Sequence, residues 1–371
     1  MNRLPCETKQ GIVTGAVPIV PQQRRFLERQ PVNSHHWTVS VVFDCSITFD
    51  VDCLRGAVRH CLQQHDALRL SFSKRKDGWK SVQSDAVTTV PLTYLDVTET
   101  KAKEEDLAIE TAVAQIEAGF NLEAGPLLHV ALFVRGGDRP DRLWIVAHEL
   151  ASDRQSLLIL AEDLLSAYRN LEQGQSVTFS PKTCSFKRWA EGIQGLTKQP
   201  DVKNQRSYWQ DILQTSAVTI PVDFPMGDNL QAAEKTVKIA ISKRYTHQLL
   251  EMVRTTEADI EAFILAALLM ATGEWTGTRS LQLELDVSGR QLFEHADFSK
   301  TIGPLSNSFL LKFAADLDES PAAIVHQISQ SLRLVSNGGA CFGWLHDCVT
   351  PSFNLIHFDY FDPLMGTEQV R

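Results

Sequence analysis

Residues 148–154, HELASDR, decide the fold of this chain. They follow residues 142–147 (RLWIVA), whose adjacent apolar residues predict a strand buried on both faces. They precede residues 156–171, in which apolar residues recur at helical spacing. A histidine and two carboxylates therefore stand where a buried strand ends and a helix begins. Because free N–H groups gather at a helix N-terminus and clefts open at strand ends, this is a frequent place for chemistry.

The composition is that of an ordinary soluble globular protein. The chain has 371 residues, of which 43% are hydrophobic and 22% charged, and this length favours two lobes. No apolar run reaches membrane-spanning length, and the N-terminus has no signal-peptide core, so we expect no membrane partner. The net charge of −9 argues against a nucleic-acid partner. Seven scattered cysteines without CxxC spacing predict free thiols and a cytoplasmic location.

Strands and helices alternate in both halves of the chain. The polar residues 170–181 predict a boundary, which gives lobes at 1–178 and 179–371. An Asp caps the first clear amphipathic helix, and residues 255–257 offer capping side chains before the last one. The expected strands are 37–43, 65–72, 79–82, 127–135, 142–147, 235–241 and 280–287, and the expected helices are 52–64, 111–120, 156–171, 243–254 and 259–275.

Residues 148–154 also resemble the HHxxxDG signature of the condensation and epimerization domains of non-ribosomal peptide synthetases. Further segments resemble that superfamily in the same order along the chain. The opening and closing segments favour the epimerization-type branch. The similar segments are 10–37 (the opening), 62–72 (LQQHDALRLSF), 208–209 (YW), 286–290 (DVSGR), 301–309 (TIGPLSNSF), 332–345 (LRLVSNGGACFGWL) and 353–362 (FNLIHFDYFD).

The resemblance implies an α/β (α+β) fold with two chloramphenicol-acetyltransferase-like lobes in a V-shaped pseudo-dimer around a central tunnel. Lobe 1–178 carries the HHxxxDG-like motif, and lobe 179–371 is expected to be truncated at its end. Ser288, Ser306 and Asn307 are expected to line the tunnel. The chain itself binds no cofactor on this view. Its substrate arrives on the phosphopantetheine arm of an acyl or peptidyl carrier protein, and neighbouring synthase modules are further partners.

The motif departs from the family at two positions, because Glu149 replaces the second His and Arg154 replaces the Gly. In the family the second His works at the substrate, while the first His and the Asp are mainly structural. The resemblance therefore gives His148 and Asp153 structural roles and puts Glu149 in the catalytic slot. Glu149 is a weak base unless burial raises its pKa above the ordinary value of about 4.3. The alternative is a carboxylate held in an ion pair, for which Arg154 is a candidate.

A second catalytic segment is altered as well. Asp286 stands where epimerization domains have the Glu of EGHGR, and Ser288 stands where they have the His. Asp286 is thus either an acid/base group or a structural, hydrogen-bonded carboxylate. Arg290 of the same segment is retained, and the family pairs this Arg with the Asp of HHxxxDG. We therefore expect a buried ion pair between Asp153 and Arg290 across the lobe interface.

The candidate catalytic residues are thus Glu149, His148 and Asp286, and the structural ones are Asp153, Arg290 and Arg154. We expect no metal site, because His35 and His36 lack spaced partners. His346, His357 and Asp359 show no helix-phased arrangement.

Three functions stay open. The first is a condensation/epimerization-like domain that docks carrier proteins, or a recruited tailoring enzyme, without standard chemistry. The second is an enzyme of redirected chemistry, such as dehydration, cyclization or isomerization of a carrier-bound acyl chain, with Glu149 as base. The third is ordinary acyl transfer or epimerization.

Overall fold

The computed structural model describes most of the chain. Contacts divide it into two compact units. The first unit comprises the described residues up to 199 together with 288–307, and the second those of 200–287 and 308–360. The division into lobes 1–178 and 179–371 stays a prediction. The predicted lobes are defined by similarity of fold, whereas the two units are defined by contacts. The described residues are 2–4, 10–29, 31, 33–85, 87, 89–136, 139–199, 205, 207–212, 220–224, 227, 234–256, 258–314, 319–345 and 356–360.

The first unit is built around a four-stranded sheet in the order β3-β8-β7-β6. The strand β8 (Asp141–His148) pairs antiparallel with β3 (Thr38–Cys45) on one side and with β7 (Leu128–Val134) on the other. The strand β6 (Leu92–Asp96) pairs parallel with β7. The strand that carries the HELASDR motif is therefore central in this sheet, and the prediction for residues 142–147 is confirmed.

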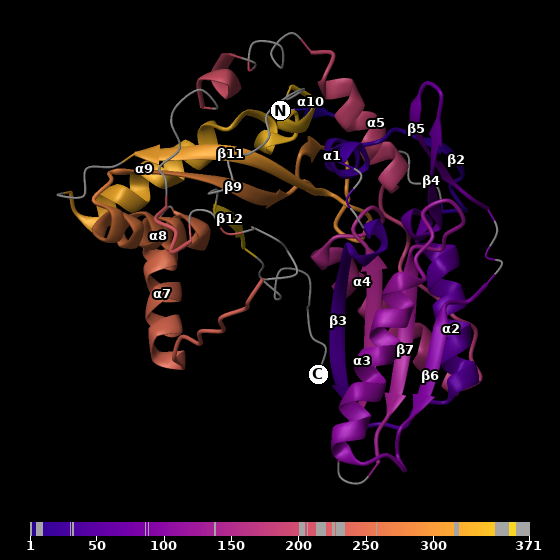
Figure 1. The fold of residues 1–371 in the computed structure, drawn as a ribbon. Helices are drawn as coiled ribbons and strands as arrows, with labels where there is room; N and C mark the ends of the chain where they lie inside the picture. The colour runs from indigo at the N-terminus through magenta and orange to yellow at the C-terminus, as the bar shows by residue number, and fades with distance from the viewer. Residues whose placement is uncertain are drawn as a thin grey trace. The chain divides into compact units, whose positions relative to one another are not determined.

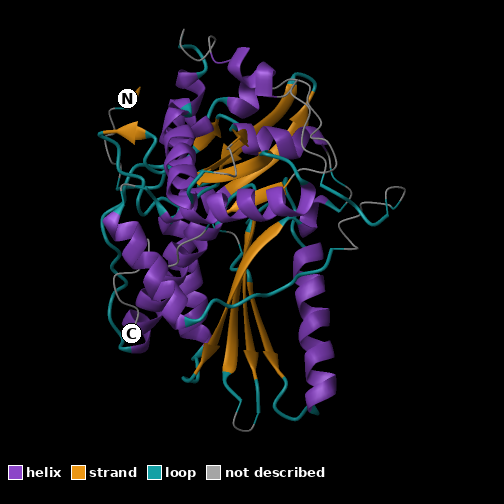
Figure 2. Cartoon of the chain, turned by 90° about the vertical axis from the view of Figure 1, so that its left-hand side faces the viewer, coloured by secondary structure: helices purple, strands orange, loops and turns teal. Residues whose placement is uncertain are grey.

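Helices cover both faces of this sheet. The helices α2 (Val51–Gln64) and α4 (Arg154–Glu172) pack on one face with Leu143, Ile145 and Ala147 of β8. The helix α3 (Ala102–Ala118) packs on the other face with Trp144 and Val146. Figure 1 shows α3 in front of the strands, and Figure 2 shows the same sheet between a pair of helices and a single one. Two apolar layers explain why β8 is apolar at adjacent positions.

Smaller elements complete the first unit. A three-stranded antiparallel sheet has the order β2-β5-β4, and β1 pairs parallel with β10. The bounds are β1 (Asn2–Arg3), β2 (Gly15–Val17), α1 (Pro21–Arg29), η1 (Ser34–His36), η2 (Asp66–Arg69), β4 (Leu70–Arg75), β5 (Gly78–Gln83), α5 (Phe186–Leu196) and β10 (Phe293–Glu294).

The second unit has a three-stranded sheet in the order β11-β9-β12. Its apolar core joins this sheet to α8, α9 and the helical residues 207–212, where Trp209 is buried. The bounds are α7 (Lys243–Thr255), α8 (Ile260–Thr276), β9 (Ser280–Ser288), β11 (Ser306–Ala314), α9 (Pro321–Leu334), η4 (Ser336–Gly339), α10 (Phe342–Leu345) and β12 (Ile356–Asp359).

One strand prediction is wrong, and another is right only in its last part. Residues 235–241 join no described strand, and Val237 and Ile239 are more than 80% exposed. Alternating apolar residues form a strand only where a neighbouring strand completes the hydrogen-bond ladder. Residues 65–72 begin as the 3-10 helix η2 and become a strand at Leu70.

The helix caps differ from the predicted ones at two helices. The side chain of Asp50, not of Asp52, accepts a hydrogen bond from the Cys53 N–H at the start of α2. Thr255 and Thr256 donate back to the Met252 carbonyl at the end of α7 and do not cap α8.

Cys184 is disulfide-bonded, so the expectation of seven free thiols is wrong. The cytoplasmic location, which relied on free thiols, stays a prediction.

Candidate active site

His148 ends β8 and is closed off from solvent. Its Nε2 donates to the Ser34 carbonyl over 2.8 Å, and its Nδ1 accepts from the Leu150 N–H over 3.1 Å. The ring is fully buried and makes an edge contact with Phe26, with 5.3 Å between the ring centres. Burial lowers the pKa of His148 to about 4, so the ring is neutral at pH 7. Because both ring nitrogens make hydrogen bonds, His148 holds the end of β8 in place. The candidate catalytic role of His148 stays a prediction.

Glu149 follows at the exit from the strand. Its backbone N–H donates to the Trp37 carbonyl over 3.0 Å, which extends the pairing of β8 with the chain before β3. Its side chain is partly buried, whereas that of His148 is fully buried. The role of Glu149 as a base stays a prediction. Arg154, which begins α4, is exposed, and its role as an ion-pair partner of Glu149 also stays a prediction.

Asp153 and Arg290 form the expected ion pair, and its geometry is bidentate. The two guanidinium NH groups donate to Asp153 Oδ2 over 2.8 Å and to Oδ1 over 2.9 Å. Asp153 is 8% exposed and Arg290 6%. Burial on its own would raise the pKa of Asp153, but the charge and hydrogen bonds of Arg290 outweigh it and the pKa is lowered. Both residues belong to the first unit, because 288–307 is part of it.

Neighbouring groups extend this pair into a network. Asp153 caps α4, where Oδ1 accepts from the Ser156 N–H over 2.8 Å, and Oδ2 accepts from the Leu305 N–H over 3.1 Å. The Ser156 hydroxyl exchanges hydrogen bonds of 3.0 Å with the backbone of Gly303 and accepts one from Arg290. A carboxylate at a helix N-terminus is also favoured by the helix dipole. The network thus ties the start of α4 to residues 301–305.

Close packing explains why residue 289, directly before Arg290, is a glycine. A Cβ at Gly289 would collide with the Leu305 carbonyl oxygen, and Trp189 donates its indole N–H to the Gly289 carbonyl over 3.0 Å. The backbone must therefore approach these neighbours closely, which only glycine permits. The SGR spacing delivers the Arg290 guanidinium to Asp153.

Asp286 lies on β9 of the second unit, beside two other titratable groups. His357 of β12 places Nε2 3.3 Å from Asp286 Oδ2 and Nδ1 3.5 Å from Glu284 Oε2. His357 shows no helical spacing with other titratable residues in the sequence, and Glu284 gives no signal of its own, so neither of them was predicted to lie beside Asp286. Strand spacing was the usable signal, since residues i and i+2 share a face. His346 lies outside the described residues.

The three residues expected along a tunnel differ in exposure. Ser288 is exposed, Ser306 is partly buried, and Asn307 is 6% exposed. The Asn307 Nδ2 is buried and has no hydrogen-bond partner within the described part of the chain. The V arrangement, the tunnel and the lining role of these residues stay predictions.

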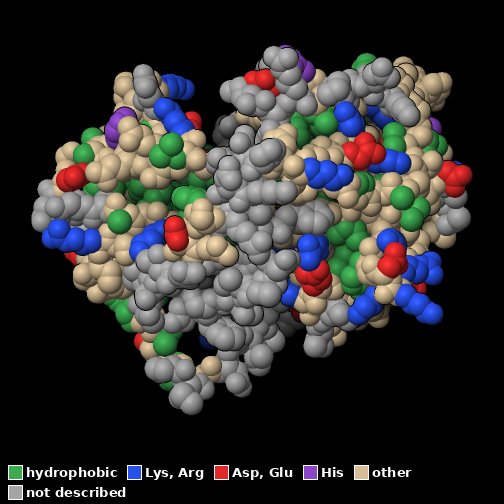
Figure 3. Space-filling model, turned by 90° about the horizontal axis from the view of Figure 1, so that it is seen from above, with side chains coloured by type: hydrophobic (Ala, Val, Ile, Leu, Met, Phe, Trp, Pro, Cys, Tyr) green, Lys and Arg blue, Asp and Glu red, His purple; other side chains and the backbone are tan. Residues whose placement is uncertain are grey.

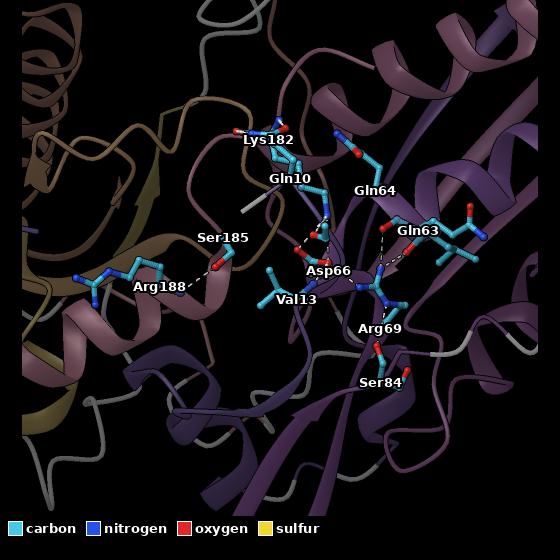
Figure 4. Close-up of polar contacts among 12 residues, drawn as sticks. Gln10, Val13, Gln63, Gln64, Asp66, Arg69, Ser84, Lys182, Ser185 and Arg188 are labelled. Atoms are coloured by element: carbon cyan, nitrogen blue, oxygen red, sulfur yellow. Dashed lines mark hydrogen bonds and ion pairs between the residues drawn. The ribbon is translucent and has the colours of Figure 1, made fainter. Parts of the chain in front are cut away.

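A second polar network explains the HDALR segment (Figure 4). Asp66 Oδ1 accepts from the Val13 N–H over 3.0 Å and pairs with Arg69 over 2.6 Å and with Lys182 over 3.3 Å. Arg69 also donates to the carbonyl groups of Leu62, Gln63 and Ser84. The i,i+3 pair closes the 3-10 turn, which is why this segment is not extended. It fastens the start of the chain to the end of α2.

A cavity of about 210 Å³ adjoins this network. His65, which is 8% exposed, lines it and contacts Asp163 of α4 through Nε2 over 2.8 Å. Lys300 pairs with Glu162 at its edge over 2.7 Å. The His65–Asp163 contact and the Lys300–Glu162 ion pair thus engage these four side chains within the scaffold.

Ser185 caps α5 at the border of this cavity, and its hydroxyl accepts from the Arg188 N–H (Figure 4). Ser185→Ala should lower the free energy of unfolding by about 1 kcal/mol, because it removes an N-cap acceptor. Denaturant unfolding checks this. Ser180→Ala, an exposed position in the same connection, is the control and should change little; equal losses in both variants would contradict the cap.

Other classes of site find no support in the described residues. Among them, no three His, Cys, Asp or Glu side chains gather so that they could hold a metal ion. None of the described helices combines the length and the apolar character needed to cross a membrane. Acidic and basic side chains intermingle among the described residues of the face drawn in Figure 3.

Comparisons with known proteins agree with the motifs. The family model of the condensation domain matches residues 13–363. One of the linear gramicidin synthase proteins of Brevibacillus parabrevis is 31% identical over 342 residues, which cover 91% of this chain and 7% of that protein. The chain therefore spans less than a tenth of the length of this curated relative.

Solved structures add a likeness of fold. The epimerization domain from the third module of tyrocidine synthetase B superposes with a TM-score of 0.85 and 26% identity, over 93% of this chain and 77% of that one. The first condensation domain of the calcium-dependent antibiotic synthetase superposes with a TM-score of 0.74, over 94% and 79% of the two chains. Its identity of 18% supports the fold alone. The expected α/β, chloramphenicol-acetyltransferase-like fold is confirmed.

Proposed function

Because the chain belongs to the condensation-domain family, we propose that it handles carrier-bound intermediates of a non-ribosomal peptide or hybrid polyketide assembly line without standard amide formation or epimerization. Its relatives include linear gramicidin synthase proteins, and its structural neighbours include an epimerization domain. The intermediates would arrive on the phosphopantetheine arm of an acyl or peptidyl carrier protein. Neighbouring synthase modules, or a recruited tailoring enzyme, are the other partners that we propose.

One contrast carries the proposal: the scaffold around the motif is intact, and the catalytic slot is altered. Asp153 and Arg290 are buried together in a bidentate pair. Removing one partner of such a pair strands the other charge, so the pair maintains the fold of the motif. Glu149, in contrast, puts a carboxyl group where the family has a histidine. This combination of a retained structural ion pair and an altered catalytic position is what we expect of a domain that keeps its fold without using the histidine base.

His148 is a poor substitute for the missing histidine. A general base must be able to reach the proton that it removes. The two ring nitrogens of His148 already bind the Ser34 carbonyl and the Leu150 N–H. Its burial also lowers the pKa to about 4, which weakens the ring as a base at neutral pH. The neighbouring histidine therefore does not restore the standard chemistry.

We expect the purified chain neither to epimerize nor to condense carrier-bound aminoacyl groups. The reason is that a carboxylate replaces the histidine base at Glu149, and that Asp286 contacts His357. The test loads a panel of aminoacyl groups on phosphopantetheinylated carrier proteins in D₂O and follows deuterium at the α-carbon by mass spectrometry. Deuterium uptake above that of the loaded carrier alone, or a new amide product, would overturn the proposal.

A binding experiment tests whether the chain docks carrier proteins even if it does not turn over their cargo. Loaded and unloaded carrier proteins are titrated against the chain by calorimetry or by NMR shifts of the carrier. Saturable binding without turnover is the expected result. Absence of binding to every carrier in the panel would count against a docking role.

An enzyme of redirected chemistry is the second candidate. Glu149 is only partly buried, in contrast to His148, and it stands directly at the strand end. A carboxylate there could remove a proton next to a thioester carbonyl, because the thioester acidifies that carbon. Dehydration, cyclization or isomerization of an acyl chain would fit this base.

A further inference from the structure

One face of the second unit's sheet gathers titratable side chains. Glu284 and Asp286 lie two residues apart on β9, and β12 runs parallel beside it with His357 opposite Glu284. Residues i and i+2 of a strand share a face, and adjacent strands lie about 4.8 Å apart. The alternate residues Leu283 and Leu285 point into the apolar core. Strand register alone therefore puts one imidazole between two carboxylates.

The contacts of this imidazole fix where its protons lie. Nδ1 is 3.5 Å from Glu284 Oε2, and Nε2 is 3.3 Å from Asp286 Oδ2. A neutral imidazole has one N–H, so its other nitrogen would turn a lone pair toward a carboxylate oxygen. The imidazolium can donate from both nitrogens. The geometry favours the protonated ring.

We propose that His357 is a positioning residue for Asp286: it carries a proton at neutral pH and holds the Asp286 carboxylate through Oδ2 in one orientation on the sheet face. This proposal goes beyond the handling of carrier-bound intermediates, and it holds whether or not the chain turns over a substrate.

The surrounding charges support a protonated ring. Hydrogen bonds that the His357 ring donates to Asp286 and then to Glu284 raise the pKa of His357 to about 10, although partial burial opposes them. Asp359 lies two residues on along the same strand and adds a further negative charge to this face. Lys312 is the one charged residue of β11, on the far side of β9.

The same arrangement distinguishes the two oxygens of Asp286. Oδ2 faces His357, whereas Oδ1 is buried and has no hydrogen-bond partner among the described residues. A buried acceptor without a donor is unfavourable, so such an atom calls for an explanation. With Oδ2 committed, Oδ1 is the oxygen that remains to accept a hydrogen bond or a proton.

The first experiment is an NMR titration of the ring signals of His357 in the histidine-labelled full chain, assigned by their absence in His357→Gln. The wild-type ring should stay protonated through pH 8. Asp286→Asn should lower its proton affinity by at least about tenfold, or one pKa unit. His247→Gln, which removes an exposed histidine beside Glu251, is the control and should leave the His357 signals unchanged. A wild-type midpoint near 6.5, or no change in Asp286→Asn, would overturn the proposal.

The second experiment separates charge from packing. A group whose pKa rises on folding stabilises the protein fully below its unfolded pKa, here 6.5, and loses that effect as pH rises through the folded value of about 10. The unfolding midpoints of wild type and His357→Gln should therefore differ most below pH 6.5 and converge toward pH 10. A difference that is the same at every pH would mean that His357 only fills space.

Discussion

Arg290→Ala should lower the free energy of unfolding by about 3–5 kcal/mol, the range for removing one partner of a buried ion pair. Arg290 donates twice to Asp153, once to the Ser156 hydroxyl and once to the Thr301 carbonyl, and it is 6% exposed. Alanine would leave the Asp153 carboxylate buried with no cation beside it. Denaturant midpoints measure the loss.

A surface pair supplies the matched control. Arg142 contacts Asp44 over 3.0 Å, and both side chains are more than a third exposed. Arg142→Ala should change stability by less than about 1 kcal/mol, because water screens such a pair. Equal losses in Arg142→Ala and Arg290→Ala would mean that the buried pair is not special. Arg290→Lys tests geometry, since lysine keeps the charge but cannot make the bidentate contact.

The same pair predicts an effect of acid. Arg290 lowers the pKa of Asp153 below its ordinary value of 3.8. Such a carboxylate contributes stability that is complete above 3.8 and is lost as pH falls through the folded value. The difference between wild type and Arg290→Ala should therefore narrow in acid and stay large at pH 7. A difference that widens as pH falls would contradict the assignment.

Local sequence patterns correctly predicted where the HELASDR motif lies between a strand and a helix. The two apolar faces of β8 and the helical spacing of α4 placed residues 148–154 at their junction, as observed. The Asp153–Arg290 pair followed from a resemblance of two distant segments. Composition alone could not have joined residues 137 positions apart.

Features that depend on a partner strand were harder to predict. Residues 235–241 alternate like a strand, yet they pair with no described strand. His357 belongs beside Asp286 only through the register of β12 on β9, which no local period reveals. In each case tertiary pairing decides the structure, and a single sequence does not specify that pairing.

Glu149→Gln should lower turnover of a carrier-bound acyl substrate by about 10²-fold or more if the chain is an enzyme of redirected chemistry, the usual weight of a general base. Glutamine keeps the shape of the side chain and cannot accept the proton. The assay follows loss of the α-proton, or release of product, from acyl groups on a phosphopantetheinylated carrier. Glu28→Gln, at an exposed position of α1 in an ion pair with Arg24, is the control and should retain full activity.

The outcome of this substitution separates the two candidate functions. Full activity in Glu149→Gln would eliminate Glu149 as the base, and with it the redirected enzyme as formulated. No activity in either form, together with unchanged carrier binding, would favour the docking domain. In that case Glu149 occupies a slot that the fold maintains through Asp153 and Arg290 but no longer uses. The burial of the Asp153–Arg290 pair would then explain why both residues are retained in a domain without catalytic activity, because losing either partner destabilises the first unit.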